Sequence, residues 1–259
     1  MFRRISERAY AVAAVLTATL CPSLTGARAE DAPKLDASAT IAATSDYVYR
    51  GVSLRDEKPT PMLYLEARYG QFYATGLLIG TYLGTDALGR GLGHIEADAT
   101  VGFAPTVGKV DFNFGVKYTG YPAGRDLVVG TLDRAERDFI EPFAGAKLNI
   151  TDTLSIGATA YWTPDFYYET GQVTTIEGQG AIVLPAFASV QSRFTVTVGS
   201  VHSERPDVAA PGDGYVYYNA GIEGQIDQLL FDLRYWGTDV GGIDVFDQRL
   251  SLSVGVKLK

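Results

Sequence analysis

Two histidines are the residues of this sequence with the most direct potential for chemistry. His94 alternates with Glu96 and Asp98 along one face of a candidate strand, and His202 opens a polar, acidic stretch that reads as a loop. A histidine beside a carboxylate can act as a general base or bind a metal ion. A hydrolase would also need a nucleophile, and no serine nucleophile signature accompanies either histidine. We therefore expect no enzyme, no cofactor and no metal site.

Two acidic loop-like stretches raise the question of calcium. They read "SERPDVAAPGDG" and "GTDVGGID". Asp and Gly are turn-forming residues first, and neither stretch has the spacing of a calcium-binding loop. Weak binding of divalent cations that bridge lipopolysaccharide remains an alternative. A third loop carries Phe166, Tyr167 and Tyr168, which could stack against carbohydrate, but we expect them to belong to an aromatic girdle or to pack against a neighbouring loop.

Residues 1–29 have the pattern of a cleaved secretory signal peptide. Basic residues open the chain, an apolar run follows from Ala9 to Leu20, and Ala27 and Ala29 precede Glu30 in the manner of a cleavage site. The segment carries four arginines and one glutamate, so its removal changes the formal net charge from −8 to −11. Such acidity argues against nucleic acid as a partner. The remaining chain, 30–259, has no cysteine and no apolar run of the length that a transmembrane helix needs.

Segments of alternating polarity then follow one another to the end of the chain. In "HIEADATVGF" every second residue is apolar, and "KVDFNFGVKY" and "TLSIGATAYW" repeat the pattern. This period of two is typical of β-strands with one apolar and one polar face. The pattern predicts about twelve strands, near 38–50, 60–70, 72–83, 93–105, 109–121, 136–148, 153–163, 172–184, 191–202, 214–225, 228–237 and 246–258.

The connections between these segments also alternate. Links such as "GQ", "TVG" and "NITD" are short, whereas "GVSLRDEKP", "TPDFYYETG" and "HSERPDVAAPGDG" are long and polar. Short turns at one end, long loops at the other and an even strand number are typical of outer-membrane barrels. We predict an all-β fold, a transmembrane antiparallel up-and-down β-barrel with short periplasmic turns and long extracellular loops. The alternative is a soluble periplasmic β-sandwich.

Aromatic residues near the strand ends would form the girdles of such a barrel. We expect Tyr47 and Tyr49 to face lipid near the outer interface, because they alternate with the charged residues Asp46 and Arg50. Further candidates for this outer girdle are Tyr82, Tyr118, Trp162 and Trp236. Candidates for the girdle at the turn end are Tyr69 and Phe103.

The stretch "SDYVYRGVSLRDEKPTPMLYLEARYG" resembles the opening segment of the TorF-type porin family of proteobacterial outer-membrane proteins. The matching positions are Ser45, Asp46, Tyr47, Tyr49, Arg50, Gly51, Val52, Ser53 and Pro59. The segment "EPFAGAKLNITDTLSIGATAYWTPDF" is similar to the middle hairpin of that family. The resemblance implies a barrel in the outer membrane of a Gram-negative cell, inserted by the barrel-assembly machinery. This chain ends on Lys259, whereas such barrels usually end on an aromatic residue.

Charged residues on the polar strand faces are the candidates for a pore lining. They are Asp46, Arg50, Glu66, Arg68, His94, Glu96, Asp98, Asp111, Lys117, Arg234 and Arg249. Twelve strands leave room for a narrow lumen, between the filled eight-strand barrels and the wide sixteen-strand porins. We expect a passive channel for small hydrophilic solutes or ions, with outer-membrane lipid and lipopolysaccharide as its surroundings. The alternative is a non-conducting barrel with a structural or adhesion role. Acidic residues in the long loops predict a weak cation preference that fades as salt rises.

Overall fold

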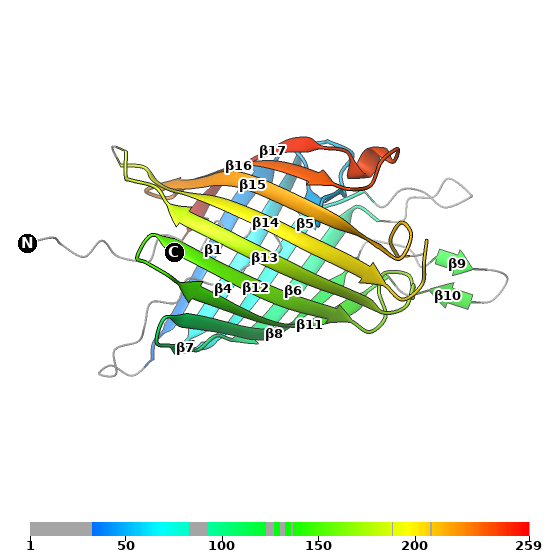
Figure 1. The fold of residues 1–259 in the computed structure, drawn as a ribbon, viewed down its shortest axis with the longest axis horizontal. Coiled ribbons are helices and arrows are strands. Elements are labelled where there is room, and N and C mark those ends of the chain that lie inside the picture. Colours follow the sequence, from blue (N-terminus) through cyan, green and yellow to red (C-terminus); the bar gives the residue numbers. More distant parts are fainter. Residues whose placement is uncertain are drawn as a thin grey trace, which may run out of the picture.

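The computed structural model describes residues 33–82, 93–122, 127–129, 133–135, 137–187, 189–207 and 209–258. Twelve long strands form one closed antiparallel barrel, with adjacent strands joined in chain order (Figure 1). They are β1 (Leu35–Thr44), β4 (Thr60–Tyr69), β5 (Phe72–Gly80), β6 (Ile95–Phe103), β8 (Val110–Gly120), β11 (Phe139–Asn149), β12 (Leu154–Thr163), β13 (Val173–Val183), β14 (Gln191–Ser203), β15 (Gly214–Ile226), β16 (Leu229–Thr238) and β17 (Arg249–Leu258). Within the described residues, no helix is long and apolar enough to cross a membrane.

The barrel closes where the first and last strands meet. β1 pairs on one side with β17, where Thr44 lies opposite Ser253, and on the other side with β4. The pairing of β8 with β11 joins the two halves of the chain, with Gly115 opposite Phe143. Every long strand therefore has two hydrogen-bonded neighbours, and the wall has no free edge.

Short secondary elements lie at the two ends of the barrel. β7 (Thr106–Val107) extends a short turn, and β9 (Leu127–Val129) pairs with β10 (Asp133–Ala135) at the long-loop end. That end also carries the 3-10 helix η3 (Asp244–Phe246) and the small β2 (Val48–Tyr49) and β3 (Val52–Ser53) pair. We call the short-turn end the inner end and the long-loop end the outer end. Two predicted long loops, at 83–92 and 123–136, lie largely outside the described residues.

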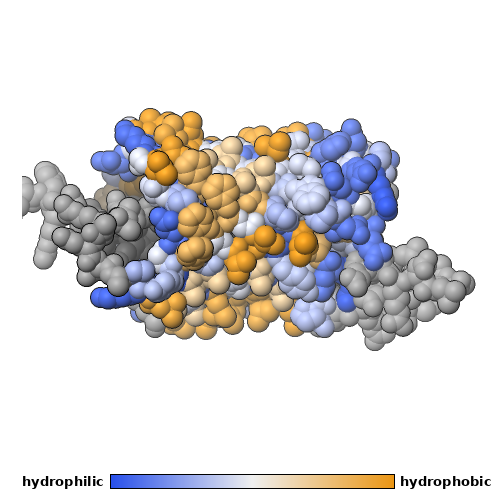
Figure 2. Space-filling model, turned by 90° about the horizontal axis from the view of Figure 1, so that it is seen from below, coloured by the Kyte–Doolittle hydropathy of each residue, from blue (hydrophilic) through white to orange (hydrophobic). Residues whose placement is uncertain are grey.

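The alternation predicted for the strands is confirmed by side-chain exposure. Along β17, apolar residues from Leu250 to Leu258 are exposed, while Arg249, Ser251 and Ser253 are buried. β6, β8 and β12 follow the same rule. The exposed apolar side chains gather into a band around the barrel, with hydrophilic residues at both ends on the face shown in Figure 2. An apolar exterior around a polar interior suits a wall between lipid and water.

The predicted strand boundaries agree with the structure to within a few residues, except at the start. The first wall strand ends at Thr44 rather than near residue 50. The chain then leaves the wall, so the prediction that Tyr47 and Tyr49 face lipid is wrong. Tyr47 is 9% exposed and Tyr49 is half-buried, and both point into the barrel.

The other girdle predictions are confirmed with one exception. Tyr82, Tyr118 and Trp162 are all exposed near the outer end, and Tyr69 and Phe103 are exposed near the inner end. Trp236 is 4% exposed instead, and its indole Nε1 donates a hydrogen bond to the Ser251 hydroxyl at 3.1 Å. The reason is strand period: Trp236 stands two residues from the buried Arg234, so both side chains point inwards. Tyr235 occupies the exposed position between them.

Candidate functional site

A hairpin inside the barrel is the central feature of the interior. After Ser45, whose backbone N–H still bonds Leu252 in the wall, residues 46–54 turn inwards. β2 and β3 pair across a two-residue turn in which Arg50 and Gly51 have φ values of 49° and 83°. Two successive positive φ values define the type I′ turn that suits tight hairpins. We call residues 46–54 the inward hairpin.

Apolar packing holds one side of the inward hairpin against the wall. Tyr47 packs in a buried cluster with Ala42, Met62 and Ile79 from β1, β4 and β5. The Tyr47 hydroxyl also donates to Glu96 Oε1 at 2.5 Å, which ties the hairpin to β6. A buried tyrosine needs such a partner for its hydroxyl group, and here the carboxylate supplies it.

The tip of the hairpin reaches the far side of the barrel. The Arg50 guanidinium makes a bidentate ion pair with Glu141 on β11, at 2.9 and 2.8 Å, and both side chains are almost fully buried. It also lies 4.8 Å from the ring centroids of Tyr49 and Tyr161, one on the hairpin and one on β12. Lys117 on β8 completes the cluster at 3.6 Å from Glu141.

Gly51 fills the space on the opposite side of the tip. A Cβ there would lie 2.6 Å from Thr238 Cγ2 and 2.9 Å from Tyr217 Cβ, so only glycine fits against β15 and β16. The inward hairpin thus touches β11 and β12 on one side and β15 and β16 on the other. It spans the lumen.

The base of the hairpin is fixed by charge. The Asp46 carboxylate accepts hydrogen bonds from the Ser53 hydroxyl at 2.9 Å and from Arg249 Nη1 at 3.3 Å. Burial raises the pKa of Asp46, and these two donors oppose the shift. Burial likewise raises the pKa of the Tyr49 phenol to about 12, so this group stays protonated at neutral pH.

Above the hairpin, towards the outer end, lies a cavity of about 230 Å³ that we call the outer cavity. The hairpin residues Tyr49, Arg50, Val52 and Leu54 form part of its lining. Aromatic rings supply much of the rest, namely those of Tyr121, Phe139, Phe166, Tyr167, Tyr215 and Phe246. Phe166 packs on Phe139 with centroids 4.7 Å apart, and Tyr167 meets Tyr121 at 5.5 Å.

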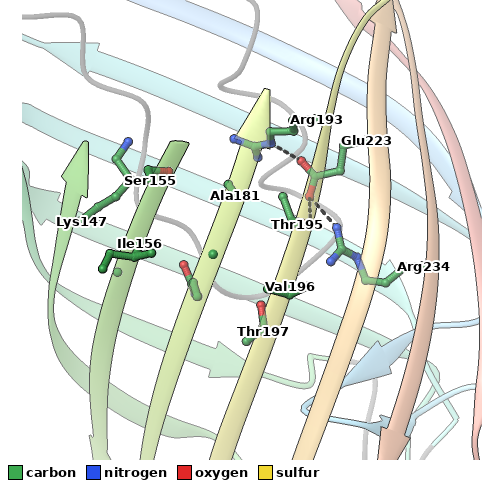
Figure 3. A pocket seen from close by; sticks show the side chains of 13 residues that line it. Lys147, Ser155, Ile156, Ala181, Arg193, Thr195, Val196, Thr197, Glu223 and Arg234 are labelled. Carbon is green, nitrogen blue, oxygen red and sulfur yellow. Dashed lines mark hydrogen bonds and ion pairs between the residues drawn. The ribbon is translucent and has the colours of Figure 1, made fainter. Parts of the chain in front are cut away.

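Ion pairs line the inner half of the barrel. Glu223 on β15 accepts from Arg193 Nε and Arg234 Nη2, each at 2.5 Å, and Arg234 also pairs with Asp232 at 2.9 Å. Beside them is a pocket of about 80 Å³, which we call the inner pocket (Figure 3). Further pairs join Lys147 to Asp111 and Arg68 to Glu66.

The structure brings ten of the eleven sequence-predicted site residues into the barrel interior. Asp46, Arg50, Arg249, Glu96, Asp98 and Lys117 lie around the hairpin, while Glu66, Arg68, Asp111 and Arg234 lie in the inner half. The exception is His94. It precedes β6, is exposed, and its ring stacks on exposed Tyr82 with centroids 6.2 Å apart. The prediction that His94 shares the lumen face of Glu96 is wrong, because His94 and Ile95 are both exposed, which breaks the strand alternation.

Several interior charges were not singled out from the sequence. They are Glu141, Lys147, Glu177, Arg193, Glu223 and Asp232. Most could have been found by alternation alone, since Glu177 follows Ile176 and Glu223 follows Ile222, and both isoleucines are exposed. Around Glu141 the pattern is obscured, because the aromatic residues Phe139 and Phe143 share its interior face.

The fold resembles known porins. The structure of the KdgM porin superposes with a TM-score of 0.52 at 10% identity, covering 86% of this chain and 98% of that chain. The NanC porin gives a TM-score of 0.51 at 10% identity, covering 86% and 100%. The KdgM porin in complex with disordered oligogalacturonate gives 0.51 at 9% identity, covering 86% and 99%. At such identities the likeness establishes a shared barrel fold.

Sequence comparison gives the family. No curated protein matches the sequence. A family model described as "Bacterial protein of unknown function (Gcw_chp)" matches residues 28–241, most of the chain, and the chain therefore belongs to this family.

Proposed function

We propose that this protein is an outer-membrane, porin-like channel for the passive diffusion of small hydrophilic solutes or ions. The observation that carries the proposal is a closed barrel with an apolar exterior and a charged interior. The apolar exterior is compatible with contact to lipid. The ion pairs that line the lumen can form polar interactions with a hydrophilic solute in place of those it makes in bulk water. Diffusion of this kind requires no catalytic group.

The location follows from the same surfaces. A wall without free strand edges, banded by apolar side chains, belongs in a bilayer, and closed barrels of this type occupy the outer membrane of Gram-negative bacteria. The proposal includes cleavage of residues 1–29, insertion by the barrel-assembly machinery, and membership of the TorF-type porins. The porin fold of KdgM and NanC supports it.

Conductance is the decisive measurement. We expect purified, refolded protein to give discrete conductance steps in planar lipid bilayers containing KCl. We also expect it to fractionate with the outer membrane and to migrate differently before and after boiling on a denaturing gel. Recovery of the protein as a soluble periplasmic species would contradict the whole proposal.

The inward hairpin favours a second candidate, a non-conducting barrel with a structural or adhesion role. It spans the lumen and is held by a buried bidentate ion pair. A folded, membrane-inserted protein that stays electrically silent in bilayers would select this second function over the first.

A further inference from the structure

The oppositely charged groups of the inner half differ in exposure. In three ion pairs of the wall, each formed within one strand or between adjacent strands, the cation is the more exposed partner. The exposed fractions of the side chains are 23% and 5% for Arg68 and Glu66, 20% and 3% for Lys147 and Asp111, and 15% and 4% for Arg193 and Glu223. The formal charges cancel, but the carboxylates lie deeper and the cations meet the water of the lumen. In these three pairs the group that faces the lumen is therefore the cation.

Two of these cations, Arg193 and Lys147, have N–H donors that their ion pairs do not use. Arg193 holds Glu223 through Nε, and Lys147 holds Asp111 through one contact at 3.0 Å. A guanidinium carries five N–H donors and an ammonium three. Within the described residues, no other hydrogen bond engages the remaining donors of these two groups. Figure 3 shows both cationic groups at the same end of the inner pocket.

The rest of the inner pocket suits a small polar group. Ser155, Gln179, Thr195 and Thr197 line it together with the two cations, and the ion-paired Glu223 and Arg234 complete its polar lining. Its volume is about 80 Å³, whereas one water molecule needs roughly 10–15 Å³ on the same scale. We propose that the inner pocket is a binding site for an oxyanion, a carboxylate or phosphate group, held by Lys147 and Arg193. Binding of an anion at this site does not depend on the proposed channel function. The further step, that the anion is part of a solute passing through the barrel, does rest on that function.

The variant that removes the site is Lys147→Gln combined with Arg193→Gln. It leaves neither carboxylate without a partner. Asp111 keeps hydrogen bonds from two uncharged side chains, and Glu223 keeps Arg234. We therefore expect the double variant to fold, which its heat-modifiable migration on a gel will show. The matched control is Lys109→Gln, which removes an exposed charge from a turn at the same end of the barrel.

Binding is measured on the detergent-solubilised full barrel, with acetate as the probe in saturation-transfer NMR and phosphate as the competitor. We expect the wild type and Lys109→Gln to bind acetate and to release it to phosphate. The double variant should bind acetate at least roughly tenfold more weakly than the wild type, because the loss of one charge-assisted hydrogen bond already has an effect of this size. Glu223→Gln should bind more tightly, because it frees Arg193 and Arg234 from a competing carboxylate. Equal acetate binding by wild type and double variant would show adventitious binding only and overturn the proposal.

Conduction gives a separate readout. Under a KCl gradient, the reversal potential of the double variant should shift towards cation preference relative to the wild type and to Lys109→Gln. A conducting wild type that binds no acetate would refute the anion site and leave the channel standing. A silent wild type that binds acetate at Lys147 and Arg193 would refute the channel and leave the site standing.

Discussion

The bidentate pair between Arg50 and Glu141 should decide whether the lumen stays divided. Glu141 is 1% exposed, so removal of Arg50 strands a buried carboxylate. Breaking a buried ion pair in this way costs about 3–5 kcal/mol. Because Lys117 at 3.6 Å and Thr163 at 3.2 Å remain beside the carboxylate, we expect the lower end, about 3 kcal/mol, for Arg50→Gln.

Release of the inward hairpin from the lumen could limit this loss of stability. Its covalent connections to the wall are at Thr44, where β1 ends, and Thr60, where β4 begins. Release of the contacts that Tyr47 and Asp46 make with the wall would let it swing out and hydrate both ends of the broken pair. If the hairpin is released, the unfolding free energy falls only by the free energy needed to release it, and this sets the upper limit of the loss. A small stability loss must therefore be accompanied by a larger conductance, because the released hairpin no longer spans the lumen.

Two assays on the same variants test this reasoning. Urea unfolding in lipid vesicles, followed by tryptophan fluorescence, gives the free energies of Arg50→Gln, Glu141→Gln and the double variant. We expect the two single losses to sum to more than the double loss, by about 2 kcal/mol, because Arg50→Gln strands the Glu141 carboxylate and Glu141→Gln strands the Arg50 guanidinium, whereas the double change removes both groups. Lys117 loses its Glu141 partner in both variants that lack Glu141, so that loss cancels in the comparison. Lys58→Gln is the control, since its pair with Asp56 is 64% exposed on both sides and solvent screens it, so its loss should leave the unfolding free energy nearly unchanged. Single variants that change neither stability by more than about 1 kcal/mol nor conductance would refute the reasoning.

Two further predictions concern the facing of the wall. Ala99 is exposed near the middle of β6, so Ala99→Arg should lower the unfolding free energy in vesicles by about 2–4 kcal/mol. Thr100→Arg points inwards and should cost much less; equal penalties would mean that the facing of β6 is wrong. Brominated lipid should quench the fluorescence of exposed Trp162 but spare Trp236, so Trp162→Phe should abolish most quenching and Trp236→Phe should not.

Period-two patterning predicted the strands of the wall because each face of the wall meets one environment along its whole length. Lipid selects apolar residues at every second position, and water selects polar ones, so each strand carries its own orientation in its sequence. The same argument explains the error at Trp236. Its neighbour Arg234 was correctly assigned to the interior, and strand period places Trp236 beside it, whatever its aromatic character suggests.

Period-two patterning gave the wrong facing for the inward hairpin, and the reason is physical. Tyr47 and Tyr49 stand two residues apart between the charged Asp46 and Arg50, in the manner of a wall strand, but the apolar surface that the two tyrosines meet is inside the barrel, at Met62 and Ile79. The signal that could have revealed the hairpin is the Arg-Gly pair between two β-forming dipeptides, because a glycine in the second central position suits a type I′ turn.

The ion pairs of the interior depend on information that no single strand carries. Arg50 and Glu141 are 91 residues apart, and their meeting requires both the inward turn of the hairpin and the position of β11 around the barrel. Apart from His94, the lumen candidates named from the sequence comprise five cations and five carboxylates. The structure adds two cations, Lys147 and Arg193, and four carboxylates, Glu141, Glu177, Glu223 and Asp232. Exposure, not count, decides what a solute meets: at the inner end Lys147 and Arg193 face the water while Asp111 and Glu223 lie deeper in the wall.

In the proposed channel, the two ends of the lumen are expected to act in opposite ways on a charged solute. Loop carboxylates crowd the outer end, and several of them also close their loops: Asp207 accepts from Gly212 N–H at 2.7 Å and Asp239 from Val216 N–H at 2.8 Å. Their charges favour cations, whereas the proposed oxyanion site in the inner pocket favours anions. Since the inward hairpin lies between these regions, a weak cation preference measured at low salt would report on the loops, which salt screens readily. A component that persists at high salt would report on the buried groups, because partly buried charges are screened much less. Reversal potentials measured over a range of KCl concentrations can therefore separate the contributions of the two ends.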